Sequence, residues 1–156
     1  MTPRWNEGRA IVDDLLSSGR LTRVAPNREL ADDYLRQARQ HISSAETLVD
    51  SDPEGAFQLA YDAARKSLAA VLVNQGLRAS GAGAHMTVHE AVRAQLGSAR
   101  TAVMDEFGWM RRLRNTTEYP ATGEKPADEH DVREAIPAAE QFIDTAEAVL
   151  DLMTAY

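Results

Sequence analysis

One polar cluster stands out in the sequence and reads Arg-Arg-Leu-Arg-Asn-Thr-Thr-Glu-Tyr. On a helix, side chains three and four positions apart share a face, so Arg111, Arg114 and Glu118 form one stripe. Asn115 and Tyr119 lie on the next stripe. The patch combines guanidinium groups that bind phosphate with an amide, a carboxylate and a phenol. The ordinary alternative is that cations suit a helix C-terminus and that Arg114 and Glu118 form an ion pair four residues apart.

Two further sites carry candidate polar side chains. Asp62 and Arg65 are three positions apart and face one way on an otherwise apolar helix. They either line the same cleft as the cluster or form an ordinary ion pair that contributes a few tenths of a kcal/mol, roughly. His85 is expected in a Gly-rich loop, and His89 in the first turn of the helix that follows. Either imidazole could approach the cluster in three dimensions.

Helical periodicity accounts for nearly the whole chain, and no strand-like alternation is visible. Ser98 is a candidate N-cap, a Thr87–Glu90 capping box starts one helix, and Pro137 is expected to kink or split the last one. The sequence predicts an all-α, up-and-down bundle of four long helices plus one or two short ones. The expected helices cover approximately residues 6–18, 27–48, 53–75, 87–96, 98–119 and 128–153.

The chain is expected to divide into a short N-terminal helix with its linker, residues 1–26, and a helical bundle, residues 27–156. Trp5 is a candidate to fasten the N-terminal arm to the bundle or to a partner chain. Tyr61 and Trp109 are interpreted as core or dimer-interface aromatics.

Composition excludes several function classes. The 156 residues include no cysteine, which excludes disulfides, a thiol nucleophile and Cys-ligated zinc. The formal net charge of −7 argues against a broadly basic nucleic-acid surface, but not against a local basic site. The four histidines are scattered along the chain, and His41 and His130 are expected on solvated helix faces. We therefore expect no metal site. With no signal peptide and no apolar run near the roughly 20 residues of a membrane span, we expect a cytoplasmic protein without a membrane partner.

Three segments together resemble the HEPN domain family over roughly residues 27–153. The subgroup that the chain resembles most is actinobacterial and carries Arg-Asn-x-x-Glu-Tyr on its late helix. The segments are Ala60-Tyr61-Asp62-Ala63-Ala64-Arg65, Gly83-Ala84-His85 and Arg114-Asn115 with Tyr119.

The resemblance implies an α-helical bundle that dimerises. Active members of the family are metal-independent ribonucleases of toxin–antitoxin and phage-defence systems, and two copies of an Arg-polar-spacer-His motif meet in one cleft. Arg114 would then bind the scissile phosphate and Asn115 would orient it, while Tyr119 stands where the family has His. Free tyrosine has a pKa of about 10 and is a poor base at neutral pH, so Tyr119 would serve as an acid, a hydrogen-bond donor or a stacking surface.

Two hypotheses follow from the resemblance. In the first, the chain is a dimer that engages RNA or a nucleotide, and acts as a metal-independent endoribonuclease that needs no cofactor. The substrate would be contacted by the remaining candidates, namely Arg111, Glu118, Asp62, Arg65 and His85. In the second, the domain is not catalytic. The Arg114–Glu118 network then closes the dimer, and function lies in binding a cognate nucleotidyltransferase or antitoxin.

Overall fold

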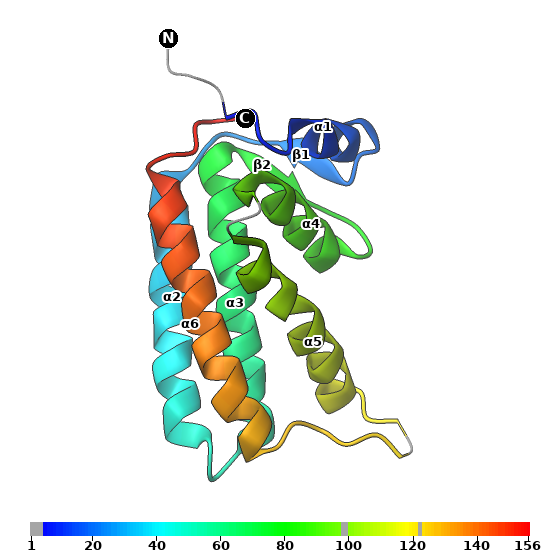
Figure 1. Ribbon diagram of the computed structural model, residues 1–156, viewed down its shortest axis with the longest axis vertical. Helices are drawn as coiled ribbons and strands as arrows, with labels where there is room; N and C mark the ends of the chain where they lie inside the picture. The colour runs from blue at the N-terminus through cyan, green and yellow to red at the C-terminus, as the bar shows by residue number, and fades with distance from the viewer. Residues whose placement is uncertain (1–4, 98–99, 122) are drawn as a thin grey trace.

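The structure is a computed structural model that describes residues 5–97, 100–121 and 123–156. Within these residues lie six helices and two short strands (Figure 1). In chain order they are α1 (Arg9–Ser17), β1 (Leu21–Arg23), α2 (Arg28–Leu48), α3 (Pro53–Gln75), β2 (Leu77–Ala79), α4 (Ala84–Leu96), α5 (Thr101–Glu118) and α6 (Glu129–Leu150).

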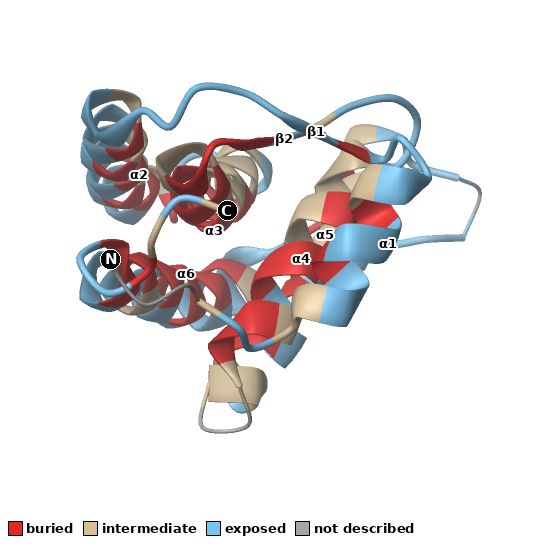
Figure 2. Cartoon of the chain, turned by 90° about the horizontal axis from the view of Figure 1, so that it is seen from above, coloured by how far each residue is buried: buried red, intermediate tan, exposed pale blue. Residues whose placement is uncertain are grey.

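Helix α3 is the centre of the bundle. It packs against α2 and α6, which run beside it, while α5 is inclined to them and α1 and α4 lie across one end (Figure 1). The inner faces are buried and the outer faces of α2 and α1 are exposed (Figure 2). Alanines on α3 are fully buried and allow the close approach of neighbouring helices, namely Ala56, Ala60, Ala63 and Ala64. The prediction of an all-α bundle with four long helices and one or two short ones is confirmed, and the described residues contain two short ones, α1 and α4.

Phe107 fastens α5 to the bundle. Its ring is fully buried and stacks on Tyr61 of α3, with 5.4 Å between the ring centroids. It also meets Phe142 of α6 edge to face at 6.1 Å. Both distances lie in the range of favourable aromatic pairs. Tyr61 thus packs against a ring that α6 itself holds in place, which restricts the position of its hydroxyl group.

The starts of the two longest helices follow from local sequence signals. The Asn27 side chain accepts a hydrogen bond from the N–H of Leu30, and that of Asp52 accepts from Gly55. These caps satisfy N–H groups that the first helical turn leaves unpaired. Gly76 ends α3 in the left-handed conformation, where a Cβ would lie 2.6 Å from the carbonyl oxygen of Val24. The predicted starts of these helices near residues 27 and 53, and the predicted end near residue 75, are confirmed.

The expectation of no strand is wrong. β1 and β2 pair antiparallel, with Leu21 opposite Ala79 and Arg23 opposite Leu77. A strand of three residues is too short for an alternation of apolar and polar side chains to be recognised in the sequence. The two strands pair because the chain that leaves α3 runs beside the linker between α1 and α2. The N-terminal segment is tied down elsewhere as well. Helix α1 packs on α4, and the Trp5 indole donates a hydrogen bond to the carbonyl of Gln95.

Helix α4 begins three residues earlier than expected. Gly83, at φ 76°, precedes it, and Ala84 is its first residue. The predicted Thr87–Glu90 capping box does not form, because Thr87 lies inside the helix, where its N–H donates to the carbonyl oxygen of Gly83. The side chains of Thr87 and Glu90 bind Arg20 instead, at 3.3 and 3.0 Å. His85 is therefore helical, and the prediction that it lies in a loop is wrong.

Helix α6 begins as expected and does not split. Asp128 and Asp131 form a reciprocal capping box, and the helix continues past Pro137 to Leu150. Pro137 is on the exposed face, where water can bind the carbonyl group that proline leaves unpaired. The predicted cap at Ser98 lies outside the described residues, and α5 begins at Thr101. Among the described residues, no helix combines the length and the apolar character that a membrane crossing requires.

Candidate functional site

The candidate site is built on the face of α5 that meets α3. The guanidinium carbon of Arg114 lies 5.7 Å from the centre of the Tyr61 ring, in cation–π geometry. Arg114 also forms an ion pair with Glu118, one turn further along α5. Its Nη1 group donates to Oδ1 of Asn115 at 3.4 Å. The Arg114 side chain remains 26% exposed, so one side of the guanidinium can be reached from solvent.

His85 joins this group from the first turn of α4. Its Nδ1 atom lies 3.2 Å from the Tyr61 hydroxyl oxygen, within hydrogen-bond distance. The sequence left open whether an imidazole approaches the arginine cluster, and the structure places His85 there. The early start of α4 makes this possible, because it turns residue 85 from a loop position into a helical one.

Burial and the local charges both favour the neutral form of His85. Burial lowers the pKa of the imidazole, and the positive charges of Arg65, Arg114 and Arg111 lower it further. Burial also raises the pKa of Tyr61, against the opposing effect of the same guanidinium groups. A neutral phenol can donate or accept, so the hydrogen bond between Tyr61 and His85 forms with either imidazole tautomer. The tautomer that places its proton on Nδ1 leaves Nε2 free to accept a proton.

Asp62 and Arg65 form the ordinary ion pair, as part of a larger network. Oδ1 of Asp62 accepts from Nε of Arg65 at 2.9 Å. Its Oδ2 lies 3.1 Å from Nε2 of His41 and 3.3 Å from Nζ of Lys66. Burial opposes ionisation of Asp62, but the hydrogen bonds and charges of Arg65 and Lys66 outweigh it and lower the pKa. The expectation of a solvated His41 is wrong, because antiparallel packing of α2 and α3 brings it against Asp62.

Tyr119 lies apart from the Tyr61–His85 pair. It caps the C-terminus of α5 and is 69% exposed. With Arg112, Thr116 and Glu124, it lines a shallow surface hollow to which Asn115 also contributes. Asn115 therefore connects the two groups, since it accepts from Arg114 and borders the hollow.

Arg111 completes the local charge pattern. It forms no ion pair among the described residues, and its charge acts on both Tyr61 and His85. Within the described residues, the charges of three guanidinium groups shift the pKa values of His85 and Tyr61, and two of these groups form ion pairs with carboxylates. The guanidinium groups belong to Arg65, Arg111 and Arg114, and the carboxylates to Asp62 and Glu118. This local excess of positive charge suits an anion, although the chain carries a net charge of −7.

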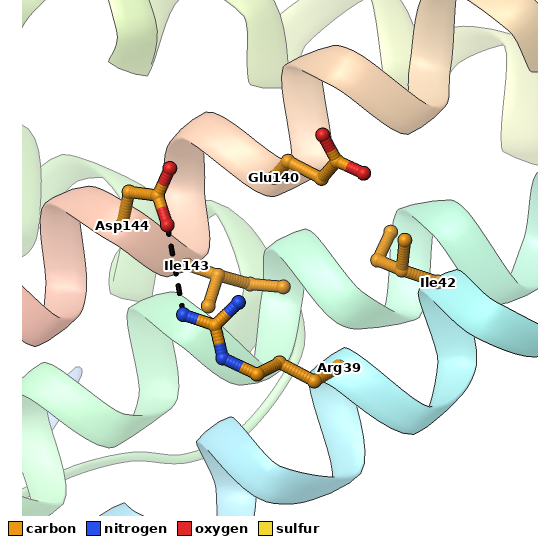
Figure 3. Close-up of a pocket in the computed structure, with 5 residues that line it drawn as sticks. All are labelled: Arg39, Ile42, Glu140, Ile143 and Asp144. Atoms are coloured by element: carbon orange, nitrogen blue, oxygen red, sulfur yellow. Dashed lines mark ion pairs between the residues drawn. The ribbon is translucent and has the colours of Figure 1, made fainter.

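A second surface hollow, between α2 and α6, contains none of the sequence-predicted site residues. It is lined by Arg39, Ile42, Glu140, Ile143 and Asp144 (Figure 3). Nη2 of Arg39 lies 3.5 Å from the Asp144 carboxylate, so its charge is balanced within the hollow. Two carboxylates line this hollow beside one arginine, so it offers no excess positive charge to a phosphate.

The remaining histidines have other environments. His89 stacks on Phe107, with ring centroids 5.0 Å apart, and its Nε2 lies 2.7 Å from the carbonyl oxygen of Met104. Burial lowers the pKa of His89, although the hydrogen bond to Met104 opposes this. His130 has a side chain 78% exposed, as expected. Within the described ranges, no three or more His, Asp or Glu side chains are grouped to hold a metal ion.

The interpretation of Tyr61 as a core aromatic is confirmed, since the residue is only 3% exposed. The hydrogen bond between its hydroxyl group and His85 was not predicted from the sequence. A signal was present: Tyr61 and Arg65 are four positions apart and share a helix face. The contribution of His41 had no local signal, because it depends on the register between α2 and α3.

The comparisons with known proteins agree with this architecture. The model of the HEPN domain family matches residues 31–149, which covers the four long helices apart from the first residues of α2 and the last residue of α6. No curated protein and no solved structure matches the chain.

Proposed function

Because this chain belongs to the HEPN domain family, we propose that it engages RNA at the cluster of Arg114, Tyr61 and His85 and cleaves it without a metal ion. One observation carries the proposal. An imidazole whose pKa is lowered by burial is hydrogen-bonded to a buried tyrosine, beside a guanidinium that solvent can reach. This arrangement supplies both a proton acceptor and a group that binds phosphate.

The proposed reaction is a transesterification of the phosphodiester. Nε2 of His85 accepts the proton of the ribose 2′-hydroxyl, and the 2′-oxygen attacks phosphorus. The new bond joins the 2′-oxygen to phosphorus while the bond from phosphorus to the 5′-oxygen breaks. The leaving 5′-oxygen then takes up the proton, which leaves a 2′,3′-cyclic phosphate and a 5′-hydroxyl. Arg114 and Arg111 stabilise the negative charge that builds up on the phosphorane.

In this proposal Tyr119 is not the base. A phenol is protonated at neutral pH, and the exposed ring offers a flat surface on which an RNA base can stack. Asn115 holds Arg114 through its Oδ1 atom and so positions the guanidinium. Asp62 fixes Arg65 in the same way, as an acceptor of two of its N–H groups.

We further propose that the chain acts as a homodimer of toxin–antitoxin or defence type. The exposed Tyr119 and the hollow beside it lie at the end of α5 that carries Arg114, so a second copy packed there would bring two clusters together. A cognate antitoxin or nucleotidyltransferase is the expected protein partner. Sedimentation of the purified protein at several concentrations tests the dimer.

The Arg114–Glu118 ion pair favours a second candidate function. Oε2 of Glu118 is buried, faces Nη2 of Arg114 and has no hydrogen-bond partner among the described residues. A carboxylate in this place neutralises Arg114 and repels phosphate. The domain would then be a non-catalytic module that acts by dimerisation and by binding a protein partner.

Cleavage of a mixed RNA in EDTA tests the enzymatic proposal. Wild type should cut RNA into fragments that end in a 2′,3′-cyclic phosphate, and Arg114→Ala should not. Arg39→Ala is the matched control, since it removes an arginine of the α2–α6 hollow. An absence of cleavage by wild type and variants alike contradicts the enzymatic proposal and leaves the second candidate. Equal losses in both variants contradict the assignment of the site to Arg114.

A further inference from the structure

A groove of about 620 Å³ follows one side of α3, and α2, α4 and β2 form its other walls. Its size is in the range of small-molecule sites, about 300–1,000 Å³. Alanine, valine and leucine supply most of its described lining, among them Leu72, Val73 and Val88. Val73 and Val88 pack on the core but are only partly buried, so a ligand can cover them. The groove therefore offers a concave apolar surface to solvent.

The charged side chains of the groove are positive. Arg65 and Arg78 line it, and no carboxylate of the described residues does. Nε and Nη2 of Arg65 both donate to Asp62, so this charge is already paired. Arg78, in contrast, is exposed on β2 and forms no ion pair within the described part of the chain. One guanidinium at the edge of an apolar surface is thus available to an anion.

Other hydrogen-bonding groups are few in the groove. Besides the arginines, the polar side chains of its lining are Asn27, Tyr34 and His85. Oδ1 of Asn27 already accepts from the N–H of Leu30, and Nδ1 of His85 already faces the hydroxyl group of Tyr61. A ligand with many polar atoms would leave several of them unpaired against apolar walls, which costs free energy. The groove is therefore complementary to a ligand with an apolar body and one anionic group.

We propose that this groove binds a small apolar carboxylic acid. The hydrocarbon body lies on Leu72, Val73 and Val88, and the carboxylate accepts hydrogen bonds from the guanidinium of Arg78. A planar guanidinium can donate two parallel hydrogen bonds to one carboxylate. Burial of the hydrocarbon adds affinity in proportion to the apolar area that leaves water. The binding does not depend on the proposed RNA activity, although His85 places the groove at the edge of the cluster.

An NMR titration of the isotopically labelled full chain tests the proposal, because it reports both the affinity of a ligand and its place on the protein. The acid probes are butyrate, hexanoate and octanoate. Octanol and octylamine are the neutral and the cationic counterparts of octanoate. Adenosine 5′-monophosphate is included as an anion with a polar body.

Four variants test the assignment of the groove. Arg78→Glu reverses the charge, and Arg78→Lys keeps it. Ala69→Phe fills the groove from α3, where Ala69 lines it and is partly exposed. Arg36→Glu is the matched control, since Arg36 is 69% exposed on α2 and does not line the groove. Thermal unfolding verifies that each variant is folded.

We expect saturable binding of octanoate, with the largest amide shifts at Leu72, Arg78 and Val88. The affinity should rise about two- to fourfold per methylene from butyrate to octanoate, the size of effect expected for burial of each group. Octanol and octylamine should bind at least about tenfold more weakly than octanoate, and Arg78→Glu should weaken octanoate by a similar factor. Ala69→Phe should weaken octanoate more than butyrate. Arg78→Lys should keep most of the affinity, and Arg36→Glu all of it.

Five results overturn the inference: no saturable binding of any acid, octanol that binds as tightly as octanoate, octanoate binding that Arg78→Glu and Ala69→Phe leave unchanged, amide shifts confined to surfaces outside the groove, and tighter binding of adenosine 5′-monophosphate than of octanoate. The titration contains no RNA, so its outcome is separable from that of the proposed function. Failure of the acid to bind leaves the proposed cleavage of RNA standing, and a protein that binds octanoate but neither binds nor cuts RNA rejects the proposed function alone.

Discussion

Two regions of the molecule place an arginine beside carboxylates on a partly buried surface, and they differ in their charge balance. Between α2 and α6, Nη2 of Arg39 lies 3.5 Å from the Asp144 carboxylate (Figure 3). The same atom lies 2.7 Å from the carboxylate of Glu147. Glu140 lines the same hollow, so carboxylates outnumber the arginine. The Arg39 side chain is 50% exposed, and water screens these charges.

Around His85 the balance is reversed. Arg111 has no carboxylate partner among the described residues, and its charge and that of Arg114 reach both His85 and Tyr61. The Arg114 and Glu118 side chains are 26% and 31% exposed, which is less than those of the α2–α6 hollow. Lower exposure strengthens the interaction of each charge with its neighbours. In this acidic chain, burial and a local surplus of arginine coincide around His85, and both are what the proposed RNA site requires.

Replacement of His85 should have the largest effect on RNA cleavage of all the changes that distinguish the two regions. His85→Asn removes the proton acceptor, and we expect the cleavage rate to fall about 10²–10⁴-fold, the usual contribution of a general base. The exposed His130→Asn is the control and should keep the wild-type rate. The measurement is single-turnover cleavage of a labelled RNA in EDTA. Full activity in His85→Asn, together with an inactive Tyr119→Phe, would instead assign the base to Tyr119.

Glu118→Gln tests whether the carboxylate competes with RNA for Arg114. Loss of the negative charge of Glu118 frees the guanidinium of Arg114 to bind phosphate. We expect the affinity for RNA to rise about 3–10-fold, the size of effect that removal of one repulsive charge typically has. Glu46→Gln, an exposed acid on α2 far from the cluster in the sequence, is the control. Fluorescence anisotropy measures the affinity. A weaker dimer with unchanged RNA affinity supports the non-catalytic module.

The pH profile of cleavage reports the charges around His85. Activity requires the neutral imidazole, and burial with the nearby arginines lowers the pKa of His85 below its ordinary value of about 6.5. The rate should therefore rise with pH through this lowered pKa and be near its maximum at pH 7. Arg111→Gln removes one positive charge, so the acidic limb should move to higher pH. The neighbouring Arg112→Gln should leave the limb in place, and a limb that is unchanged in Arg111→Gln contradicts the assignment.

The smallest effect is expected in the α2–α6 hollow. Arg39→Ala breaks exposed ion pairs, which typically contribute about 0.2–1 kcal/mol each, so the free energy of unfolding should fall by about 1 kcal/mol or less. Urea denaturation measures this change. A larger fall in the free energy of unfolding would contradict the exposed character of these ion pairs. A loss of RNA affinity equal to that in Arg114→Ala would show that the α2–α6 hollow also contributes to RNA binding.

Sequence predicted the helices well where the signals are local. The caps at Asn27 and Asp52 and the stop at Gly76 depend on residues within one turn. Prediction failed at α4, because Thr87 and Glu90 have the pattern of a cap but bind Arg20, which is 67 and 70 residues away. The strands were missed for the same reason, since their pairing joins segments on either side of two long helices.

The candidate site was partly visible in the sequence. Helical spacing placed Arg111, Arg114 and Glu118 on one stripe, and the Arg114–Glu118 ion pair is present. The meeting of His85 with Tyr61 joins residues 24 positions apart on separate helices, and no local rule specifies it. The surplus of positive charge around His85 likewise arises from packing of α5 on α3, which the sequence pattern does not contain.

The most direct test of the central claim is the affinity of the full chain for a 2′-O-methyl RNA, which binds but lacks the 2′-hydroxyl needed for cleavage. Anisotropy titrations compare wild type, Arg114→Ala and Arg39→Ala in the same buffer. We predict that Arg114→Ala weakens binding at least about tenfold, since a charge-assisted hydrogen bond to phosphate is lost, while Arg39→Ala binds like wild type. Equal affinities of Arg114→Ala and wild type, or no binding by wild type, would contradict the account.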